Sequence, residues 1–457
     1  MSKLFLSISC LIFYISLSAQ YLETTISVGL YPRALLYNPI NNKLYCANWG
    51  SHNISVIDGE NNQLITILEV DSNPTALTYN SNNNKIYCAN EKSNTISVID
   101  GENNQLITTI CVGIKPIALF FNPMTNCLYC ANAGTNNISI IDGNKDIVIT
   151  TIDVGYFPND FTYNPANNKI YCANLDSENI TVIDAVTHQI RIIIPVRVAP
   201  CDLVYNSHNN KIYCANWGNS SVTIINGETD SIITNIYPGW CPWSLAYDSI
   251  NNKIYSANFF SDNVTVIDGV SNQILQIIPV GARPKNILYD DVNNLLYCAN
   301  YGSGNVTVIN CMSNQIISMI DVGSQPVCLA LNKQYNRIYV ANFTSGTVSV
   351  IKGNIGVNES NRKILKFKDF EVYPNPTNNY FMIHSNFEAD EIKLYDVNGK
   401  LIKKEKMQNY APYRSYSQEA KVIRFSLSGV KSGVYFVQIG NERIKRKLVV
   451  RKSLNDK

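Results

Sequence analysis

One eight-residue phrase recurs along this chain at a fixed interval. It reads Asn-Asn-Lys-Ile-Tyr-Cys-Ala-Asn at residues 83–90, and each related copy keeps the central Tyr. Neighbouring copies of this Tyr are 42 residues apart, as in 87 − 45 = 42, with no insertion or deletion. The eight copies are Tyr45, Tyr87, Tyr129, Tyr171, Tyr213, Tyr255, Tyr297 and Tyr339. Because propellers and helical arrays both have periods in this range, the content of each unit must decide between them.

Each repeat consists of short β-rich runs separated by turn residues. In one copy the runs occupy residues 76–79, 85–89, 95–99 and 106–110. The segments between them are rich in Asn, Asp, Ser and Gly, which favour turns. No window shows a helical period with capping residues. The repeat therefore predicts four antiparallel strands joined by hairpins.

The two ends of the array complement each other. Residues 22–29 match the fourth strand of a repeat, although no repeat precedes them. The last repeat, residues 327–353, contains the first three strands and lacks the fourth. An N-terminal strand that completes the last blade would close a ring and remove the open sheet edge. We therefore predict an all-β, eight-bladed β-propeller over residues 20–354.

Two repeated positions predict how the blades pack. Tyr45 and Ala47 point the same way by the two-residue period of a strand, so we expect rings and methyl groups between neighbouring blades. The position between them holds Cys in six repeats, and Ser256 and Val340 in the other two. A position that accepts Cys, Ser or Val is typical of a small buried site, so we expect packing there rather than disulfides or metal binding. The six are Cys46, Cys88, Cys130, Cys172, Cys214 and Cys298.

The repeated phrases also resemble a known family. Tyr-Cys-Ala-Asn, Thr-Ile-Ser-Val-Ile-Asp-Gly and Val-Gly-x-x-Pro are similar to the YVTN β-propeller repeat of surface-layer and other exported proteins. The resemblance covers about residues 21–354 and implies a propeller fold and an extracellular location. It brings no catalytic residues. Such propellers often have seven blades, so the expected count of eight departs from the common case.

The N-terminus has the form of a secretory signal. Lys3 precedes an apolar run over residues 4–17, and Ser18-Ala19 supplies small residues before a cut. The run is too short for a bilayer span, and we expect cleavage after Ala19, which removes residues 1–19. No later stretch is long and apolar enough to cross a membrane, so we expect no transmembrane segment in the mature chain.

The C-terminal residues form a separate part of the chain. The repeat stops near residue 354, a polar linker covers 355–369, and a small β-sandwich domain is expected over 370–457. The first 354 residues carry 17 Lys and Arg against 24 Asp and Glu, whereas the remainder carries 20 against 11. The ring is therefore mildly acidic and the tail basic.

Three phrases of the tail, in order, resemble the type A (Por) sorting domain of type IX secretion substrates. They are Tyr-Pro-Asn-Pro at 373–376, the Asp-x-x-Gly-Lys turn at 396–400 and Gly-Val-Tyr-Phe at 433–436. The resemblance implies the type IX secretion machinery as a partner, export across both membranes of a Gram-negative bacterium, and removal of this domain during export. An ordinary accessory β domain that binds a ligand is the alternative.

No set of residues indicates catalysis. The four His fall in turns of different blades or in the tail, and no metal-ligand cluster or phosphate-binding Gly-rich motif is present. We therefore expect no catalytic residues, no metal and no cofactor. An enzyme stays open as an alternative, because propellers can assemble single residues from several blades near their axis.

Aromatic residues gather in the loops expected on one face of the ring. These loops lead into the first strand of each blade or join its second and third strands, and they contain all four Trp. Exposed rings suit sugar or protein ligands, although the same rings also suit packing between loops. The candidate ligand-binding residues are Trp49, Trp217, Trp240, Trp243, Phe259 and Tyr301. The preferred patch is Trp217, Trp240, Trp243 and Phe259 of blades five and six.

The sequence thus favours an exported propeller, secreted or attached to the cell surface, that binds glycan or protein through this face. A propeller enzyme of the lactonase or lyase kind and a structural surface-coat component are the alternatives. We expect no nucleic-acid partner.

Overall fold

The computed structural model describes residues 20–353, 370–373, 380–385, 391–396, 400–406, 421–427, 430–431, 433–439 and 445–450. The expected signal peptide at 1–19, the expected linker at 355–369 and the centre of the Asp-x-x-Gly-Lys turn, residues 397–399, lie outside the described residues. The chain divides into two compact units, Met1–Gly356 and Val357–Lys457.

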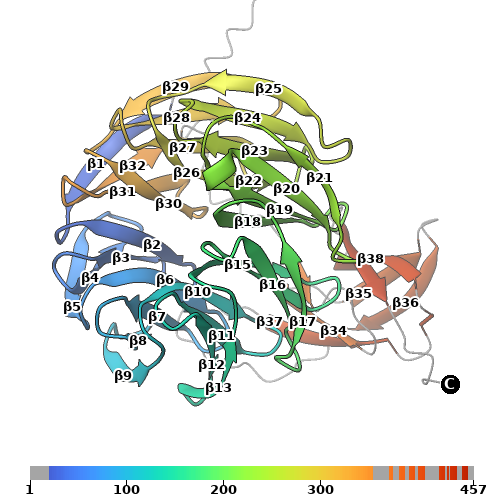
Figure 1. The fold of residues 1–457 in the computed structure, drawn as a ribbon. Helices are drawn as coiled ribbons and strands as arrows, with labels where there is room; N and C mark the ends of the chain where they lie inside the picture. The colour runs from blue at the N-terminus through green and yellow to red at the C-terminus, as the bar shows by residue number, and fades with distance from the viewer. Residues whose placement is uncertain are drawn as a thin grey trace, which may run out of the picture. The chain divides into compact units, whose positions relative to one another are not determined.

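The first unit is a ring of eight four-stranded antiparallel sheets around a common axis (Figure 1). We number the blades 1 to 8 by their inner strands, which surround the axis. The inner strands are β2 (Pro32–Asn38), β6 (Pro74–Asn80), β10 (Pro116–Asn122), β14 (Pro158–Asn164), β18 (Pro200–Asn206), β22 (Pro242–Asp248), β26 (Pro284–Asp290) and β30 (Pro326–Asn332). Every inner strand begins at a Pro, whose missing N–H and fixed φ suit the start of a strand.

The second and third strands form the middle of each blade. The second strands are β3 (Lys43–Asn48), β7 (Lys85–Asn90), β11 (Cys127–Asn132), β15 (Lys169–Asn174), β19 (Lys211–Asn216), β23 (Lys253–Asn258), β27 (Leu295–Asn300) and β31 (Arg337–Asn342). The third strands are β4 (Asn53–Asp58), β8 (Thr95–Asp100), β12 (Asn137–Asp142), β16 (Asn179–Asp184), β20 (Ser221–Asn226), β24 (Asn263–Asp268), β28 (Asn305–Asn310) and β32 (Thr347–Lys352). In blade 5 a 3₁₀ turn, η1 (Trp217–Asn219), connects β19 to β20.

The outer strands complete the blades. They are β5 (Leu64–Glu69), β9 (Leu106–Cys111), β13 (Ile147–Asp153), β17 (Ile190–Pro195), β21 (Ile232–Ile236), β25 (Ile274–Pro279), β29 (Gln315–Asp321) and β1 (Tyr21–Ser27). Strand β1 pairs antiparallel with β32 of blade 8, from Tyr21 opposite Lys352 to Ser27 opposite Thr347. The predicted closure of the ring by the N-terminal strand is therefore confirmed, as is the count of eight blades.

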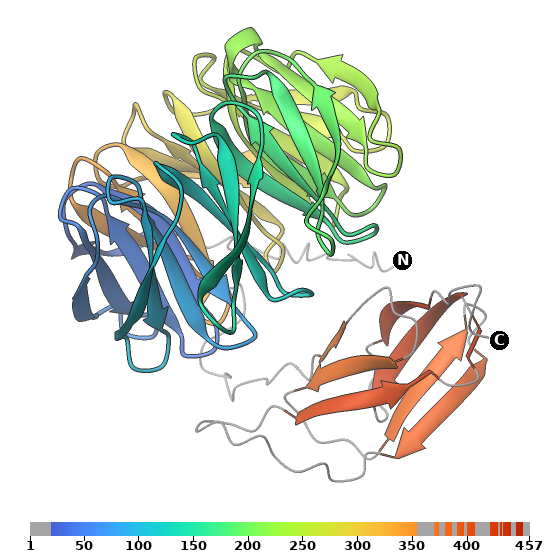
Figure 2. The ribbon, with the colours of Figure 1, turned by 60° about the horizontal axis from the view of Figure 1, so that its bottom comes forward.

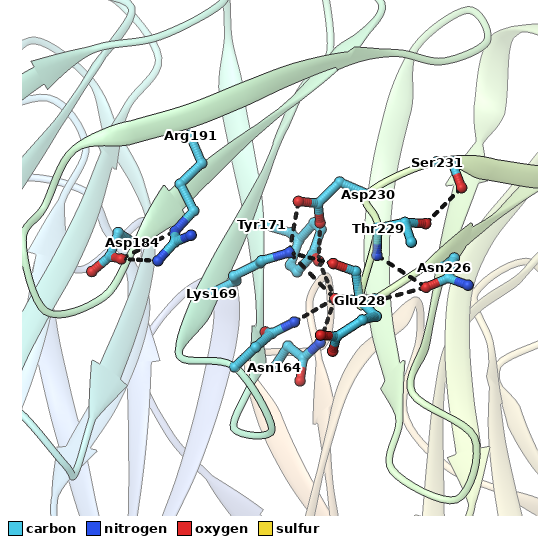
Figure 3. A network of polar contacts seen from close by, with 12 residues as sticks. Asn164, Lys169, Tyr171, Asp184, Arg191, Asn226, Glu228, Thr229, Asp230 and Ser231 are labelled. Carbon is cyan, nitrogen blue, oxygen red and sulfur yellow. Dashed lines mark hydrogen bonds and ion pairs between the residues drawn. The ribbon is translucent and has the colours of Figure 1, made fainter. Parts of the chain in front are cut away.

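The repeated Tyr side chains join each blade to the next. All eight are buried, and the hydroxyl of Tyr171 in blade 4 donates to Asp230 in the outer turn of blade 5 at 2.6 Å. Lys169 binds the same carboxylate at 2.7 Å, and Figure 3 shows this network. In the equivalent turn of blade 4, the Nδ1 atom of His188 lies 2.9 Å from the Tyr129 hydroxyl. This His is thus half-buried between blades, whereas the sequence alone indicated a turn residue.

Tyr339 makes the same contact across the junction of the ring. Its hydroxyl donates to Asn62 of blade 1 at 3.1 Å. Blade 8 has no turn between its third and outer strands, because its outer strand comes from the N-terminus. The hydroxyl of Tyr297 in blade 7 accordingly makes no hydrogen bond with any described residue. Seven of the eight Tyr therefore pack between neighbouring blades and also donate a hydrogen bond to the next blade. Tyr297 packs between blades in the same way but makes no such bond with a described residue.

The repeated Cys position lies in the core between the blades. The six Cys side chains, together with Ser256 and Val340, have no exposed surface. They pack against apolar residues of the neighbouring blade, as Cys88 does against Tyr45 and Ile54. The cysteines of the described residues are free thiols.

The second unit contains two antiparallel sheets, drawn in orange and red in Figure 2. One sheet consists of β33 (Phe370–Tyr373), β34 (Tyr380–Ser385) and β37 (Lys421–Ser426). The other has the order β36 (Leu401–Lys406), β35 (Glu391–Asp396), β38 (Gly433–Ile439) and β39 (Lys445–Val450). Its apolar interior includes Ile392, Leu394 and Val437. This arrangement confirms a small C-terminal β domain.

Candidate functional site

Two sets of loops form one face of the ring, which we call the loop face. One set leads into the inner strands, and the other joins the second and third strands. Backbone hydrogen bonds hold them together in each blade, as where Trp217 N–H donates to Ala199 at 2.9 Å and Phe259 N–H donates to Cys241 at 2.9 Å. Residues that directly follow the second strand therefore occupy equivalent places around the axis. The prediction that these two loop sets share a face is confirmed by these bonds.

Four aromatic side chains from blades 5, 6 and 7 touch one another in sequence across the loop face. Trp217 meets Trp243 edge-on, with ring centroids 6.0 Å apart. Trp243 lies 5.6 Å from Phe259, and Phe259 lies 6.2 Å from Tyr301. Each of these four side chains remains partly exposed. We call Trp217, Trp243, Phe259 and Tyr301 the aromatic arc.

The other two candidate residues lie outside the arc. Trp240 is 72% exposed and its ring contacts no other aromatic ring among the described residues, although its carbonyl accepts from Phe260 N–H at 3.2 Å. Trp49 belongs to a second cluster, in which Tyr31 lies 6.3 Å from Trp49 and 4.9 Å from Phe343. The structure therefore brings together three of the four residues of the preferred patch, adds Tyr301, and separates Trp240 and Trp49 from them.

A lysine that the sequence reasoning missed lies within the arc. The ammonium of Lys285 is 4.8 Å from the centroid of Tyr301 and 5.2 Å from that of Trp243. These distances are in the range of cation–π contacts. The repeat could have predicted that Lys285 lies near the arc. Lys285 and Trp243 both directly follow a Pro that begins an inner strand, one repeat apart.

A network of charges connects the second cluster to blade 3. Glu91 accepts from the indole N–H of Trp49 at 3.1 Å and from Arg33 at 3.2 Å. The ammonium of Lys115 lies 3.8 Å from Glu91 and 5.0 Å from the ring of Phe157. Arg33 and Lys115 thus share the carboxylate of Glu91, so one positive charge of this group is not neutralised within it.

Two acidic residues lie on neighbouring inner strands. Asp160 in β14 accepts from Leu203 N–H at 2.7 Å, and Asp202 in β18 accepts from Leu245 N–H at 2.5 Å. Burial raises the pKa of Asp160, and burial together with the charge of Asp160 raises the pKa of Asp202. Both residues keep some exposed surface, although their carboxyl groups are buried. In the first three repeats the same position is Ala, so these carboxyls were visible in the sequence as departures from the repeat.

The described residues offer no evident metal centre. No group of three or more His, Cys, Asp or Glu side chains in the described part of the chain is placed to hold a metal ion. What the loop face presents instead is a partly exposed set of aromatic rings with one ammonium among them.

Comparison with known protein families identifies the C-terminal part of the chain. Residues 371–451 match the secretion system C-terminal sorting domain. This chain carries a type IX sorting domain. The sorting domain indicates export by type IX secretion to the cell surface or the outside. No helix in the described part of the chain has the length and apolar character needed to cross a bilayer.

Solved structures with a similar fold include propellers. Hydrazine synthase of Kuenenia stuttgartiensis shares 20% identity with this chain at a TM-score of 0.52, and the match covers 63% of this chain and 98% of the other. Sqt1 of Saccharomyces cerevisiae shares 11% identity at a TM-score of 0.65, with 74% and 100% covered. At such identities the likeness concerns the fold alone. A search of curated proteins gives no match.

Proposed function

We propose that this protein is an exported propeller, secreted or held at the outer cell surface, that binds a glycan or protein ligand through the aromatic arc. The observation that carries the proposal is the continuous contact of four partly exposed rings across three blades. Rigid rings offer contact area at a small cost in conformational entropy, and rings of this kind are enriched where proteins bind partners. The resemblance of the repeats to YVTN propellers of exported proteins supports the same assignment.

The arc differs from aromatic packing that serves only the fold. The repeated Tyr side chains, which pack between blades, are fully buried. Trp243 and Phe259 instead keep partial exposure on a face from which Phe260 and Trp240 also project, at 53% and 72% exposure. A ligand that covers the arc would bury this remaining apolar surface, and removing apolar surface from water favours association.

The test is a binding assay with the full-length mature protein. Immobilised polysaccharides and surface-protein extracts serve as the ligand panel, with wild type compared against Trp217→Ala combined with Trp243→Ala. The double variant is expected to lose binding to whichever panel member the wild type recognises. Tyr156→Ala removes a ring that is 65% exposed on the same face, outside the arc, and is expected to bind like wild type. Equal binding by the double variant, with its fold intact, would contradict the proposal.

A second candidate function is an enzyme that uses the inner strands. The observation in its favour is the pair Asp160 and Asp202, two carboxyls of raised pKa on neighbouring inner strands. Groups with such pKa values are the kind that catalytic sites use as acids and bases. Lactone and polysaccharide substrates are the appropriate screen, with Asp160→Asn as the inactive comparison. Turnover that survives in this variant would rule out the assignment of Asp160.

A further inference from the structure

Among the partly buried lysines of the described ring, Lys285 differs in having no hydrogen bond or ion pair for its ammonium. Lysines that begin the second strands bind the outer turn of the following blade, as Lys253 does with Asn314 at 2.8 Å and Lys169 with Asp230 at 2.7 Å. Lys285 makes no hydrogen bond or ion pair with any described residue, although it is partly buried between Trp243 and Tyr301. Placing a charge in such a site is costly unless an opposite charge accompanies it.

The nearest acid of the neighbouring loop, Asp262, accepts from Arg283 N–H at 2.7 Å and makes no ion pair with Lys285. Burial lowers the pKa of Lys285, and the nearby charge of Arg33 lowers it further. Glu91 is occupied by Arg33, Trp49 and Lys115, as described above. From blade 6 through blade 1, the residues that follow the inner-strand Pro or the second strand include no acid: they are Trp243, Phe259, Lys285, Tyr301, Val327, Phe343, Arg33 and Trp49. These positions thus supply no ion-pair partner for Lys285, and a carboxylate of a ligand can take that place.

The rings beside Lys285 restrict what this anion belongs to. The rings of Trp243 and Tyr301 both contact the ammonium, and both belong to an arc that extends over three blades. A ligand for such a site needs flat, weakly polar faces repeated along its length, with an acidic group at the edge of at least one unit. Linear polysaccharides built from uronic acids have these properties, because each sugar has an apolar C–H face and a carboxylate on its rim.

We propose that the aromatic arc binds an acidic, uronate-containing polysaccharide, and that the ammonium of Lys285 pairs with a sugar carboxylate while sugar faces stack on Trp243 and Tyr301. This assignment rests on the proposed function of the arc and adds the chemical class of its ligand. Lys285 is then the residue that selects acidic over neutral chains, since the rings by themselves stack on either. Paired with a carboxylate in a partly buried site, an ammonium contributes more than a surface ion pair does.

The experiment uses the full-length mature protein and three probes: hexagalacturonate, its carboxyl-reduced neutral counterpart, and a hexaglutamate peptide. Binding is measured by calorimetry at low and moderate salt. Wild type is expected to bind hexagalacturonate at least about tenfold more tightly than the neutral sugar, and the preference is expected to shrink with added salt. Lys285→Met keeps the length of the side chain without its charge, so it is expected to lose that preference while retaining the neutral sugar.

Two control variants separate this inference from the proposed function. Lys92→Met removes an exposed cation of the loop face outside the arc and is expected to change neither affinity. Trp243→Ala is expected to weaken both sugars. If both sugars bind equally and only Trp243→Ala weakens them, the arc remains a binding site and the role of Lys285 is refuted. Preference for the hexaglutamate peptide, or no binding of hexagalacturonate by wild type, would overturn the polysaccharide assignment.

Discussion

Asp160 in the inner strand of blade 4 accepts a hydrogen bond from the backbone N–H of Leu203 in the inner strand of blade 5, at 2.7 Å. The relationship recurs one blade further on between Asp202 and Leu245. In blade 7 the same position is Asn286, whose amide oxygen accepts from Leu329 N–H at 3.0 Å. At these three junctions between inner strands, the bridging side chain is thus either an acid or an amide.

This equivalence predicts the effect of Asp160→Asn on stability. Burial raises the pKa of Asp160 from 3.8 to about 7, so the folded state binds a proton that the unfolded state releases over this range. The carboxyl therefore favours folding below about pH 4, and this contribution is lost as the pH rises through about 7. Asn fits the position in blade 7 and carries no charge. We expect the variant to match wild type near pH 4 and to be more stable at pH 8, by up to about 4 kcal/mol.

Urea unfolding followed by Trp fluorescence provides the measurement, because all four Trp lie in the ring. Asp176→Asn, which removes an exposed carboxyl of blade 4, is expected to show no pH-dependent difference from wild type. Loss of stability at pH 8 in Asp160→Asn would show that the charge is needed.

Substitution of Glu23 is expected to reduce the stability of the ring strongly, because this residue helps to close it. Its carboxylate in β1 accepts from Nε of Arg337 in β31 at 2.6 Å and from Nη2 at 2.7 Å. The same guanidinium donates to the carbonyl of Gly59 in blade 1 at 2.8 Å, so one Arg ties together both ends of the array. Glu23→Gln is expected to destabilise the ring by about 1–3 kcal/mol in urea unfolding, since it leaves a largely buried guanidinium with a weaker partner.

A matched comparison is Lys333→Met, which removes an exposed ion pair with Asp291 and is expected to cost less than about 0.5 kcal/mol. The difference between Glu23→Gln and wild type should also depend on pH. Burial raises the pKa of Glu23, but its hydrogen bond with Arg337 and the charge of that residue bring it below 4.5 overall. The stabilisation is present above that value and is lost as the pH falls through the lowered pKa, so an effect unchanged in strong acid would contradict this origin.

Substituting Phe for the repeated Tyr is expected to reduce stability by different amounts at different blades. Tyr171→Phe removes the hydrogen bond to Asp230 and is expected to destabilise the ring by about 1–2 kcal/mol. Tyr297→Phe provides the comparison, because the turn that would accept its hydroxyl does not exist in blade 8, and is expected to cost less than about 0.5 kcal/mol. Thermal and urea unfolding of both variants test this; similar losses at the two positions would mean that the turn hydrogen bond contributes little.

The cysteines are expected to react with very different rates. Cys111 on the outer strand β9 is exposed, whereas Cys88 and its equivalents have no exposed surface. Burial raises the pKa of the Cys88 thiol, which further lowers the fraction of reactive thiolate. Iodoacetamide labelling of the native protein, followed by peptide mass spectrometry, should modify Cys111 first and the repeated cysteines only after unfolding. Cys111→Ser should remove the fast reaction, and rapid native labelling of Cys88 would show that the blades open locally.

Much of the fold was predictable from the sequence because its determinants repeat within short stretches. The four strands follow from alternating apolar runs and turn residues within 42 positions, and the absence of insertions keeps every blade in register. The closing role of β1 followed from counting strands at the two ends. The sorting domain was also predictable from the sequence, because its short turn and strand motifs occur in a fixed order along the chain.

Only the tertiary structure decided which loop side chains form one surface. Trp240 and Trp243 are three residues apart, yet Trp243 joins the arc and Trp240 points to solvent. Lys285 reaches the arc from the next blade, and Asp160 finds its partner on a strand one repeat further along. These contacts depend on how adjacent blades are rotated and packed around the axis, which is set by the buried repeated Tyr side chains and by closure of the ring. The apolar runs and turn residues within one repeat determine each blade. A site shared by several blades forms only when the blades pack together in the closed ring.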